Sequence, residues 1–395
     1  MDQEAKDLSV LKPDISWVIF GGGSKPTSFR RILAEYLDES SSIILVTKSI
    51  SALRRPHLLF SERKICVSGQ VKEYRPLHTP ERIPGLRRFL QSLNHKRFLR
   101  EIGSFCQKPP AVVCYDSPTQ FPLVKQLGEK LSIYLAVDDR TLTVEGEGIP
   151  GELEAEKILL SRVDMVICIS QVLAARLRTR IPSGITLPIH ALPNGYDKKI
   201  FNIEREYPEP PFLVGVPRPR ILVAGHISQR IDWDGLLSVA RARPKWMWVF
   251  LGPADEGMKE RIARKFAKRG FYHPPVLVND VPAWISHCDA SAVPYRLNPF
   301  TLASHPLKAM EYLAMGKPLL STRVPSLEGY DGVVEWVEEG VGKSYAQALD
   351  RILRQDGNPE IETMRMRAVA DDSWDARVDQ FRKIVLEGLN SGNKS

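Results

Sequence analysis

Short apolar runs rich in β-branched residues alternate with helical patterns along the chain, in two successive series. Strands that are separated by helices form parallel βαβ units, with helices on both faces of the sheet. The strands predicted in the first series are 15–20, 42–47, 111–115, 132–137 and 165–170, and those in the second are 220–225, 247–252, 275–278, 290–295 and 318–322. A helix is predicted at 29–37. The sequence therefore predicts an α/β fold with two Rossmann-like domains facing across a cleft.

A proline-rich segment at 204–219 separates the two series. The chain of 395 residues is long enough for two domains of about 150–200 residues each. We therefore expect an N-terminal domain at 1–203, a linker at 204–219 and a C-terminal domain at 220–372. The remaining residues, 373–395, are expected to form an amphipathic helix that begins near Trp374.

The composition favours a globular protein of a reducing compartment with an anionic partner. The net charge is +8, which suits a nucleotide sugar, an anionic lipid or a nucleic acid. No apolar run approaches the roughly 18 residues of a membrane span, and the N-terminus does not have the pattern of a secretory signal. The five cysteines form no CxxC pair, which indicates a cytoplasmic protein. No nucleic-acid-binding motif is present, so we expect no nucleic-acid partner.

Residues 82–100 contain six arginines and lysines and no acidic residue. Apolar residues lie between them at nearly helical spacing, so the segment is predicted to form a basic amphipathic helix. Such a helix suits peripheral contact with an anionic membrane, on the inner face of the plasma membrane for a cytoplasmic protein. The alternative is an ordinary surface helix whose apolar side packs on the sheet.

The segment 295–322 carries the clearest functional pattern. Pro306 suits the first turn of a helix and Gly316 suits its C-terminal end. Lys308 and Glu311 are three residues apart and share one face of that helix. Unpaired N–H groups at a helix N-terminus attract a phosphate, and Lys308 adds a full cation there. Glu311 lies one turn deeper, where it could accept hydrogen bonds from a ribose. The pattern predicts a clamp for a nucleoside diphosphate.

Five motifs that occur in order resemble those of retaining glycosyltransferases with the GT-B fold. The most specific is PxKxxEYLAxGKPxxST at 306–322. The others are DMVICIS at 164–170, PNGYDKKIF at 193–201, RILVAGHIS at 220–228 and WVFLGPA at 248–254. The chain is most similar to the glycosyltransferase family 4 branch that includes bacterial polysaccharide enzymes of the teichuronic-acid type.

This resemblance implies that the N-terminal domain binds an acceptor and the C-terminal domain binds a nucleotide-sugar donor, a UDP- or GDP-sugar. It also implies that the final helix crosses back to the first domain. The expected reaction is hexosyl transfer to a glycan, lipid-linked or small-molecule acceptor, with retention and without a metal ion. Two alternatives are a sugar-nucleotide epimerase or hydrolase on the same fold, and a non-catalytic nucleotide-binding partner.

Two glycine-containing loops follow predicted strands at the cleft. Gly22 and Gly23 follow the first strand, where glycine lets the backbone approach a ligand closely. The resemblance implies that this loop touches the donor phosphates or the acceptor from across the cleft, and the alternative is a plain turn. Gly225 and Arg230 follow the first strand of the second domain. The planar guanidinium of Arg230 can hold a diphosphate through two hydrogen bonds. The alternative is a salt bridge from Arg230 to Asp232 or Asp234.

Asp138 and Asp139 end the predicted strand 132–137. Adjacent side chains on a strand point in opposite directions, so we expect at most one of the two to face the cleft. That aspartate would orient the acceptor hydroxyl or accept its proton. The other would cap the following segment or pair with Arg140.

The resemblance adds several weaker candidates in the second domain. Asn298 and Thr301 lie in a polar loop from which side chains could reach sugar hydroxyls, and Val278 lies where relatives contact the base. The family often has two glutamates separated by seven residues. Glu311 matches the second, but the first position is Ala303. Catalysis would then depend mainly on charge, with Lys308 and Arg230 stabilising the departing diphosphate.

Two polar positions of the first domain also match the family. Ser170 and Asn194 lie at matching positions, and we expect them to form a helix cap and a hinge turn.

Overall fold

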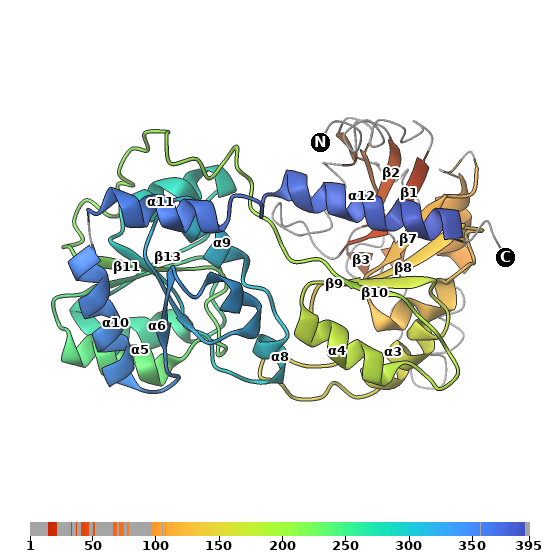
Figure 1. Ribbon diagram of the computed structural model, residues 1–395. Helices are drawn as coiled ribbons and strands as arrows, with labels where there is room; N and C mark the ends of the chain where they lie inside the picture. The colour runs from red at the N-terminus through yellow and green to blue at the C-terminus, as the bar shows by residue number, and fades with distance from the viewer. Residues whose placement is uncertain are drawn as a thin grey trace.

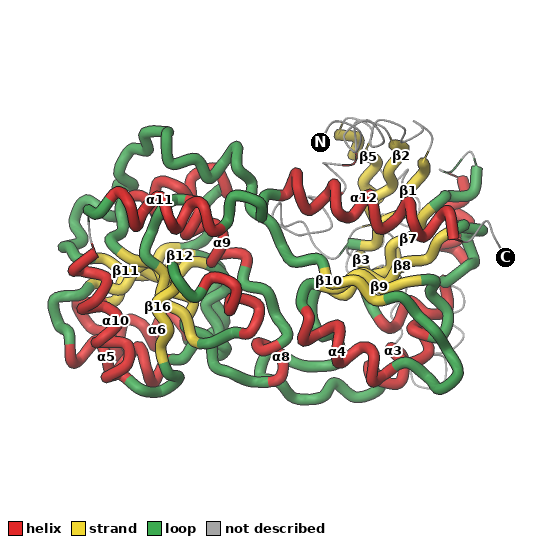
Figure 2. Tube along the Cα trace, in the orientation of Figure 1, coloured by secondary structure: helices red, strands yellow, loops and turns green. Residues whose placement is uncertain are grey.

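A computed structural model describes residues 15–21, 33, 37, 41–46, 50–51, 66–68, 71–74, 77–78, 96–104, 106, 108–355 and 357–391. Within these residues the chain forms two large sheets, one in each half of the molecule (Figures 1 and 2). Helices alternate with the strands and cover both faces of each sheet. The predicted α/β fold with two Rossmann-like domains is confirmed.

The first sheet has the strand order β10-β9-β8-β7-β1-β2-β5-β4. Its strands are β1 (Ile15–Phe20), β2 (Ser41–Val46), β4 (Cys66–Ser68), β5 (Val71–Tyr74), β7 (Val112–Tyr115), β8 (Leu131–Ala136), β9 (Met165–Cys168) and β10 (Ile189–Ala191). All neighbours in it are parallel except β4 and β5. A separate pair joins β3 (Ile50–Ser51) to β6 (Leu77–His78). Helices α3 (Glu152–Leu160) and α4 (Gln171–Arg180) pack on one face of the first sheet.

The second sheet is entirely parallel, in the order β13-β12-β11-β14-β15-β16. Its strands are β11 (Arg220–Ala224), β12 (Met247–Leu251), β13 (Gly270–His273), β14 (Ala290–Val293), β15 (Leu319–Thr322) and β16 (Val334–Val337). One face is covered by α5 (Trp233–Ala242), α6 (Met258–Phe266) and α10 (Gly342–Gln355). The other packs against α7 (Val281–Ser286) and α9 (Leu307–Ala314), and α11 (Pro359–Ala368) lies on α9. The short helix α8 (Pro299–Leu302) lies between the domains (Figure 1).

One predicted strand is wrong. The segment 275–278 is not a strand, and Val278 begins a short 3-10 helix, Val278–Asp280. The strand is β13, which pairs with β12 and ends just before Pro274 and Pro275. Proline has no backbone N–H to donate to a sheet, so two consecutive prolines end the strand before the apolar run begins. The other predicted strands agree with observed ones to within two residues at each end.

The chain passes between the domains twice, and the two passages lie side by side. Tyr196 N donates to Asp372 O at 3.0 Å, and Trp374 N donates to Tyr196 O at 2.9 Å. A side chain at Gly195 would place its Cβ 2.8 Å from Trp374 N, so only glycine permits this close approach. The final helix α12 (Trp374–Ser391) then runs across the first domain, as expected (Figure 1).

The apolar side of α12 packs into the first domain. Its buried residues are Trp374, Val378, Phe381 and Val385. The rings of Phe381 and Trp17 are 5.8 Å apart. This face of the first sheet is therefore completed by the C-terminal end of the chain.

Two predicted helices lie partly outside the described residues. Of the helix at 29–37, only Leu33 and Leu37 are described, and both are helical and buried. Of the basic segment 82–100, only 96–100 is described, within a helix at 96–104. None of the described helices is long and apolar enough to cross a membrane.

Candidate functional site

Three residues from two segments converge at the C-terminal edge of the second sheet. A Cβ placed on Gly225 would lie 3.9 Å from Arg230 Nη2 and 4.0 Å from Lys308 Cγ. Gly225 and Arg230 belong to the loop after β11, and Lys308 lies in the first turn of α9. Gly225 has φ +128°, which a residue with a side chain rarely adopts. The site therefore combines two cations with a bare stretch of backbone, at the edge where open parallel sheets bind ligands.

Two further contacts hold these loops in place. Ala224 N donates to the hydroxyl of Tyr312 at 2.8 Å, which ties the end of β11 to α9. Gly252, at the end of β12, approaches so closely that a Cβ there would lie 2.0 Å from Gly225 O. Neither Tyr312 nor Gly252 is among the predicted site residues. The available signal for Gly252 was a glycine at the end of a predicted strand.

Arg230 has donors available for a ligand. Its guanidinium lies over the Tyr295 ring, 4.9 Å from the centroid, and its buried Nε has no hydrogen-bond partner. Among the described residues it forms no ion pair, so the alternative of a salt bridge to Asp232 or Asp234 is wrong. A guanidinium that is oriented by an aromatic ring and lacks a carboxylate partner suits an anionic ligand.

Asp232 is instead part of a helix cap. One of its carboxylate oxygens accepts from Gly235 N at 3.0 Å, and the other accepts from Gly340 N at 2.8 Å and the Tyr345 hydroxyl at 2.9 Å. With Asp234 it forms an Asp-x-Asp sequence, a spacing found in metal sites. Three donors occupy the carboxylate oxygens of Asp232, so Asp232 acts as a helix cap and not as a metal ligand. Within the described part of the chain, no three His, Cys, Asp or Glu side chains cluster as metal ligands.

Lys308 and Glu311 form an ion pair on one face of α9, with Nζ 2.5 Å from Oε2. The Glu311 side chain is 2% exposed and that of Lys308 is 20% exposed. Burial raises the pKa of Glu311, and the Lys308 ammonium opposes this effect. The N-cap residue of α9 is Pro306, which supplies no side-chain acceptor. The first N–H groups of α9 therefore have no side-chain cap.

The two aspartates after β8 differ in their surroundings. Asp139 is buried, and its carboxylate lies 2.9 Å from Arg180 Nη2 and 3.4 Å from Arg176 Nη1, with the Thr141 hydroxyl donating at 2.6 Å. Burial alone would raise the pKa of Asp139, but the hydrogen bonds from Arg180 and Thr141 bring it below its usual range. Asp138 is half-buried. An aspartate already held by two arginines is a poor proton acceptor, so Asp138 is the better candidate of the pair.

Arg140 does not pair with Asp139. It lies 3.8 Å from Asp116 instead. The expected capping role of Asp139 is present, since Thr141 N donates to its carboxylate at 3.3 Å.

The polar loop before α9 uses its side chains locally. Asn298 caps α8 by accepting from Thr301 N at 2.9 Å, and the Thr301 hydroxyl accepts from Asn298 N at 3.0 Å. Thr301 is 1% exposed. The hydrogen bonds of these groups therefore stabilise the loop. Val278 is half-buried, and Gly22 and Gly23 lie outside the described residues.

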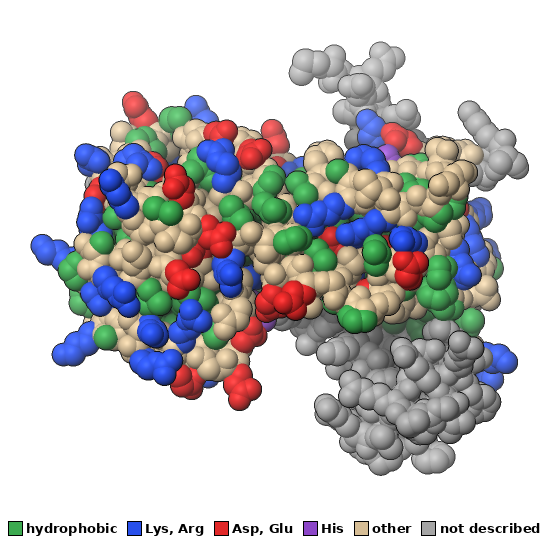
Figure 3. All heavy atoms as spheres, turned by 90° about the horizontal axis from the view of Figure 1, so that it is seen from below, with side chains coloured by type: hydrophobic (Ala, Val, Ile, Leu, Met, Phe, Trp, Pro, Cys, Tyr) green, Lys and Arg blue, Asp and Glu red, His purple; other side chains and the backbone are tan. Residues whose placement is uncertain are grey.

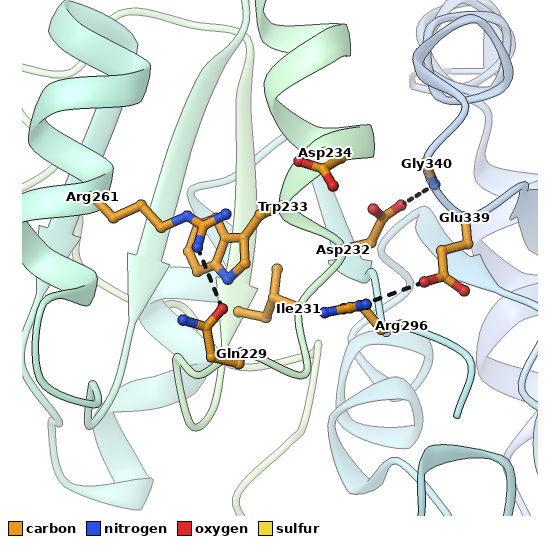
Figure 4. A pocket seen from close by; sticks show the side chains of 9 residues that line it. All are labelled: Gln229, Ile231, Asp232, Trp233, Asp234, Arg261, Arg296, Glu339 and Gly340. Atoms are coloured by element: carbon orange, nitrogen blue, oxygen red, sulfur yellow. Dashed lines mark hydrogen bonds and ion pairs between the residues drawn. The ribbon is translucent and has the colours of Figure 1, made fainter. Parts of the chain in front are cut away.

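A polar cavity of about 250 Å³ is lined in part by the loop after β11 (Figure 4). The neighbours of Arg230 in sequence, Gln229 and Ile231, line it together with Asp232, Trp233, Asp234, Arg261, Arg296, Glu339 and Gly340. An adjoining cavity of about 310 Å³ has walls from both domains, since Glu145 and Glu147 line it together with Arg296 and Asn298. Polar cavities thus extend from the loop after β11 to the space between the domains.

Comparison with known proteins agrees with this architecture. Residues 218–355 match the family described as Glycosyl transferases group 1. The chain is 25% identical over 237 residues to a Bacillus subtilis (strain 168) protein provisionally named teichuronic acid biosynthesis glycosyltransferase TuaH. That match covers 58% of this chain and 59% of the relative, less than two thirds of its length.

Solved structures with other sequences share the fold. Sucrose-phosphate synthase from Thermosynechococcus elongatus has a TM-score of 0.73 at 17% identity, covering 95% of this chain and 100% of that chain. Anabaena HepE in complex with UDP and glucose has a TM-score of 0.65 at 13% identity, covering 94% and 99%. An E. coli trehalose-6-phosphate protein bound with UDP-2-fluoro glucose has a TM-score of 0.70 at 11% identity, covering 93% and 98%. The chain has the GT-B fold. Its residues 218–355 are similar to a glycosyltransferase group 1 domain.

Proposed function

We propose that the protein is a glycosyltransferase that moves a sugar from a nucleoside-diphosphate sugar to a glycan, lipid-linked or small-molecule acceptor. The observation that carries this proposal is the convergence of Gly225, Arg230 and Lys308 beside buried Glu311. Two cations and the uncapped N-terminus of α9 suit a diphosphate. When the nucleotide enters, Lys308 turns toward the phosphates and leaves the Glu311 carboxylate to the ribose hydroxyls. UDP-sugars are the first candidates, because two structures of this fold contain UDP or a UDP-sugar, and GDP-sugars are the second.

In this proposal the chemistry is mainly electrostatic. Arg230, Lys308 and the N–H groups of α9 stabilise the negative charge that develops on the departing diphosphate, and such preorganised charge is usually the largest catalytic contribution. Asp138, at the end of β8 in the first domain, orients the acceptor hydroxyl or accepts its proton. The acceptor attacks from the face that the diphosphate leaves, so the configuration is retained.

A panel of UDP-, GDP-, dTDP- and ADP-sugars tests this proposal by thermal shift. A ligand that binds the native state stabilises it by RT ln(1 + [L]/Kd), about 2.7 kcal/mol at a concentration of 100 Kd. We expect one nucleotide class to raise the Tm, and Glu311→Gln to weaken its binding because the ribose loses a charged acceptor. Glu335→Gln is the control, since Glu335 lies on β16 and pairs with Arg351 at 2.8 Å. If no nucleotide raises the Tm of the parent protein, the proposed function is wrong.

Sugar transfer is expected to continue in EDTA. In the proposed site Arg230 and Lys308 neutralise the diphosphate, a task that other enzymes give to a divalent cation. The measurement is the initial rate before and after chelation, with modest stimulation by Mg²⁺ permitted because the released diphosphate binds it. Complete loss of activity in EDTA, restored by Mg²⁺ or Mn²⁺, would show that a metal is part of the donor site.

We further propose that this protein acts in the cytoplasm and that its 82–100 segment makes peripheral contact with an anionic membrane. In the described part of this segment Lys96 and Arg100 are exposed, whereas Phe98 is buried and its ring is 5.4 Å from that of Phe20. Membrane contact would therefore use the basic side of the helix. Each basic residue near an anionic surface adds about 1 kcal/mol. Replacing Arg87, Arg88, Arg97 and Arg100 with Gln should abolish cosedimentation with phosphatidylserine vesicles at low salt.

A control with the same loss of charge uses the second domain. Lys259, Arg264, Lys265 and Lys268 are exposed on or next to α6, and their replacement by Gln should leave vesicle binding intact. Basic and acidic side chains are intermixed on the face of that domain that Figure 3 shows. Equal binding by both variants and the parent would show that 82–100 is an ordinary surface segment.

A further inference from the structure

The peptide between α8 and α9 is held against the first domain through its backbone carbonyls. Ser170 Oγ donates to Ala303 O at 2.6 Å, and Asn194 Nδ2 donates to His305 O at 2.8 Å. A third donor, Arg176 Nη1 in α4, reaches Pro299 O. The residues immediately after this peptide, Pro306 to Lys308, begin the helix of the proposed donor site. The first domain therefore holds the segment that leads directly into the clamp.

Arg176 differs from the other two donors because it also belongs to a buried network of charges. The same Nη1 lies 3.4 Å from the Asp139 carboxylate, which Arg180 binds at 2.9 Å. Arg180 in turn lies 2.7 Å from Glu156, which accepts from the Tyr134 hydroxyl at 2.8 Å. Asp139, Glu156 and Tyr134 are all buried in the first domain. Arg176 is the outermost member of this network, and it is the member that contacts the second domain.

The surrounding packing keeps Arg176 in this position. Asn298 Nδ2 donates to Val144 O at 3.0 Å, and a Cβ on Gly146 would lie 2.8 Å from Pro299 Cδ. The turn around Gly146 thus meets the N-terminus of α8 closely, beside the carbonyl that Arg176 binds. A guanidinium has several donors in a fixed plane, so it can bind a carboxylate and a carbonyl together.

We propose that Arg176 is a positioning residue that couples closure of the two domains to the acceptor side of the site. Asp139 fixes Arg176, and Asp139 directly follows Asp138, the proposed acceptor-orienting group. Pro299, at the other end of the contact, leads through α8 to Lys308. Arg176 therefore sets the distance between the acceptor-orienting strand end and the donor clamp while touching neither substrate. This inference rests on the proposed function.

The test compares Arg176→Ala and Arg176→Lys with the matched control Arg178→Ala. Arg178 is exposed on the same helix, and it donates at 3.4 Å to Ile189 O within the first domain. Three quantities are measured: the radius of gyration by small-angle X-ray scattering, the Kd for UDP, and kcat with the sugar nucleotide that gives the largest Tm rise.

For Arg176→Ala we expect a larger radius of gyration and a UDP Kd within about twofold of the parent, since Arg230, Lys308 and Glu311, which carry the proposed UDP contacts, all lie in the second domain. We expect kcat to fall about 10-fold to 100-fold, because misplacing reacting groups by about 1 Å can cost 10²-fold. Arg176→Lys should recover part of kcat, and Arg178→Ala should match the parent in all three measurements.

Two results would overturn the coupling role. One is a folded Arg176→Ala variant with the parent's radius of gyration and kcat. The other is a loss of UDP affinity as large as the loss of kcat, which would indicate damage to the donor domain itself. If the parent protein binds no nucleotide, the proposed function fails separately, and the scattering comparison alone decides whether Arg176 holds the domains together.

Discussion

Replacing Lys308 with alanine is expected to lower kcat for sugar transfer by about 10²-fold to 10³-fold, the usual effect of removing one preorganised group that stabilises developing charge. Lys308 lies in the first turn of α9, and its Cγ and Arg230 Nη2 lie 4.0 Å and 3.9 Å from the position of a Cβ on Gly225. Its charge matters most when the diphosphate departs, so kcat should fall more than the donor KM rises. Steady-state kinetics with varied donor concentration measures both quantities.

The control for this substitution is Lys343→Ala, which removes an exposed lysine from α10 of the same domain. Circular dichroism is needed to check that both variants are folded, because α9 also packs Ala309 and Met310, the neighbours of Lys308, into the core. A folded Lys308→Ala variant with the parent's kcat would place the leaving-group charge elsewhere. The close approach of Arg230 and Lys308 to Gly225 would then stabilise the fold and have no part in catalysis.

Replacing Asp139 with alanine is expected to destabilise the first domain by about 3 kcal/mol, since breaking a buried ion pair leaves a charge without its partner. In the variant Arg180 still pairs with Glu156 at 2.7 Å, so we expect the loss of stability to lie at the lower end of the usual range. Chemical denaturation followed by far-UV circular dichroism measures the difference. The control is Glu154→Ala, which removes an exposed pair with Lys157 and should cost less than about 1 kcal/mol.

This stabilisation by Asp139 should also depend on pH. Its folded-state pKa is lowered, whereas the unfolded chain has the ordinary value of about 3.9. A lowered carboxyl pKa contributes stability above the unfolded value, and this contribution is lost as the pH falls through the folded value. The difference between the parent and Asp139→Ala should therefore be constant near neutrality and shrink below about pH 4. A difference that grows on acidification would contradict the ion-pair explanation.

The central strands of the two sheets were predictable because they are buried on both faces. Such strands appear in the sequence as unbroken apolar runs, as in Ile15–Phe20, whose predicted and observed bounds agree. The helix of the clamp was predictable from its ends. Pro306 stands at its N-cap, and Gly316, just beyond its last turn, has φ +67°. Both ends of the helix can be predicted because each depends on the conformational preference of a single residue.

Other features depend on partners that are distant in sequence. Asp139 is 41 residues from Arg180, and no local pattern distinguishes this partner from adjacent Arg140. The same limit applies to Thr301. From the sequence, its hydroxyl could bind a sugar or form part of a helix cap, and only the folded loop shows that it accepts from Asn298 N in the cap. Strand β16 was not predicted, because its sequence VEWV places a glutamate inside a four-residue strand.

The paired passages at Tyr196 and Trp374 have a consequence for how such proteins diversify. The polypeptide enters and leaves its second domain through adjacent backbone segments, so that domain is connected like a module inserted into the first. Helix α12 belongs to the recipient, because Phe381 and Val385 complete the recipient's core. If two relatives exchanged the segment between residues 196 and 373, the whole second domain would be transferred as one unit. If the exchanged segment instead ran from residue 203 to the C-terminus, it would include α12. Helix α12 would then be separated from the first domain against which it packs.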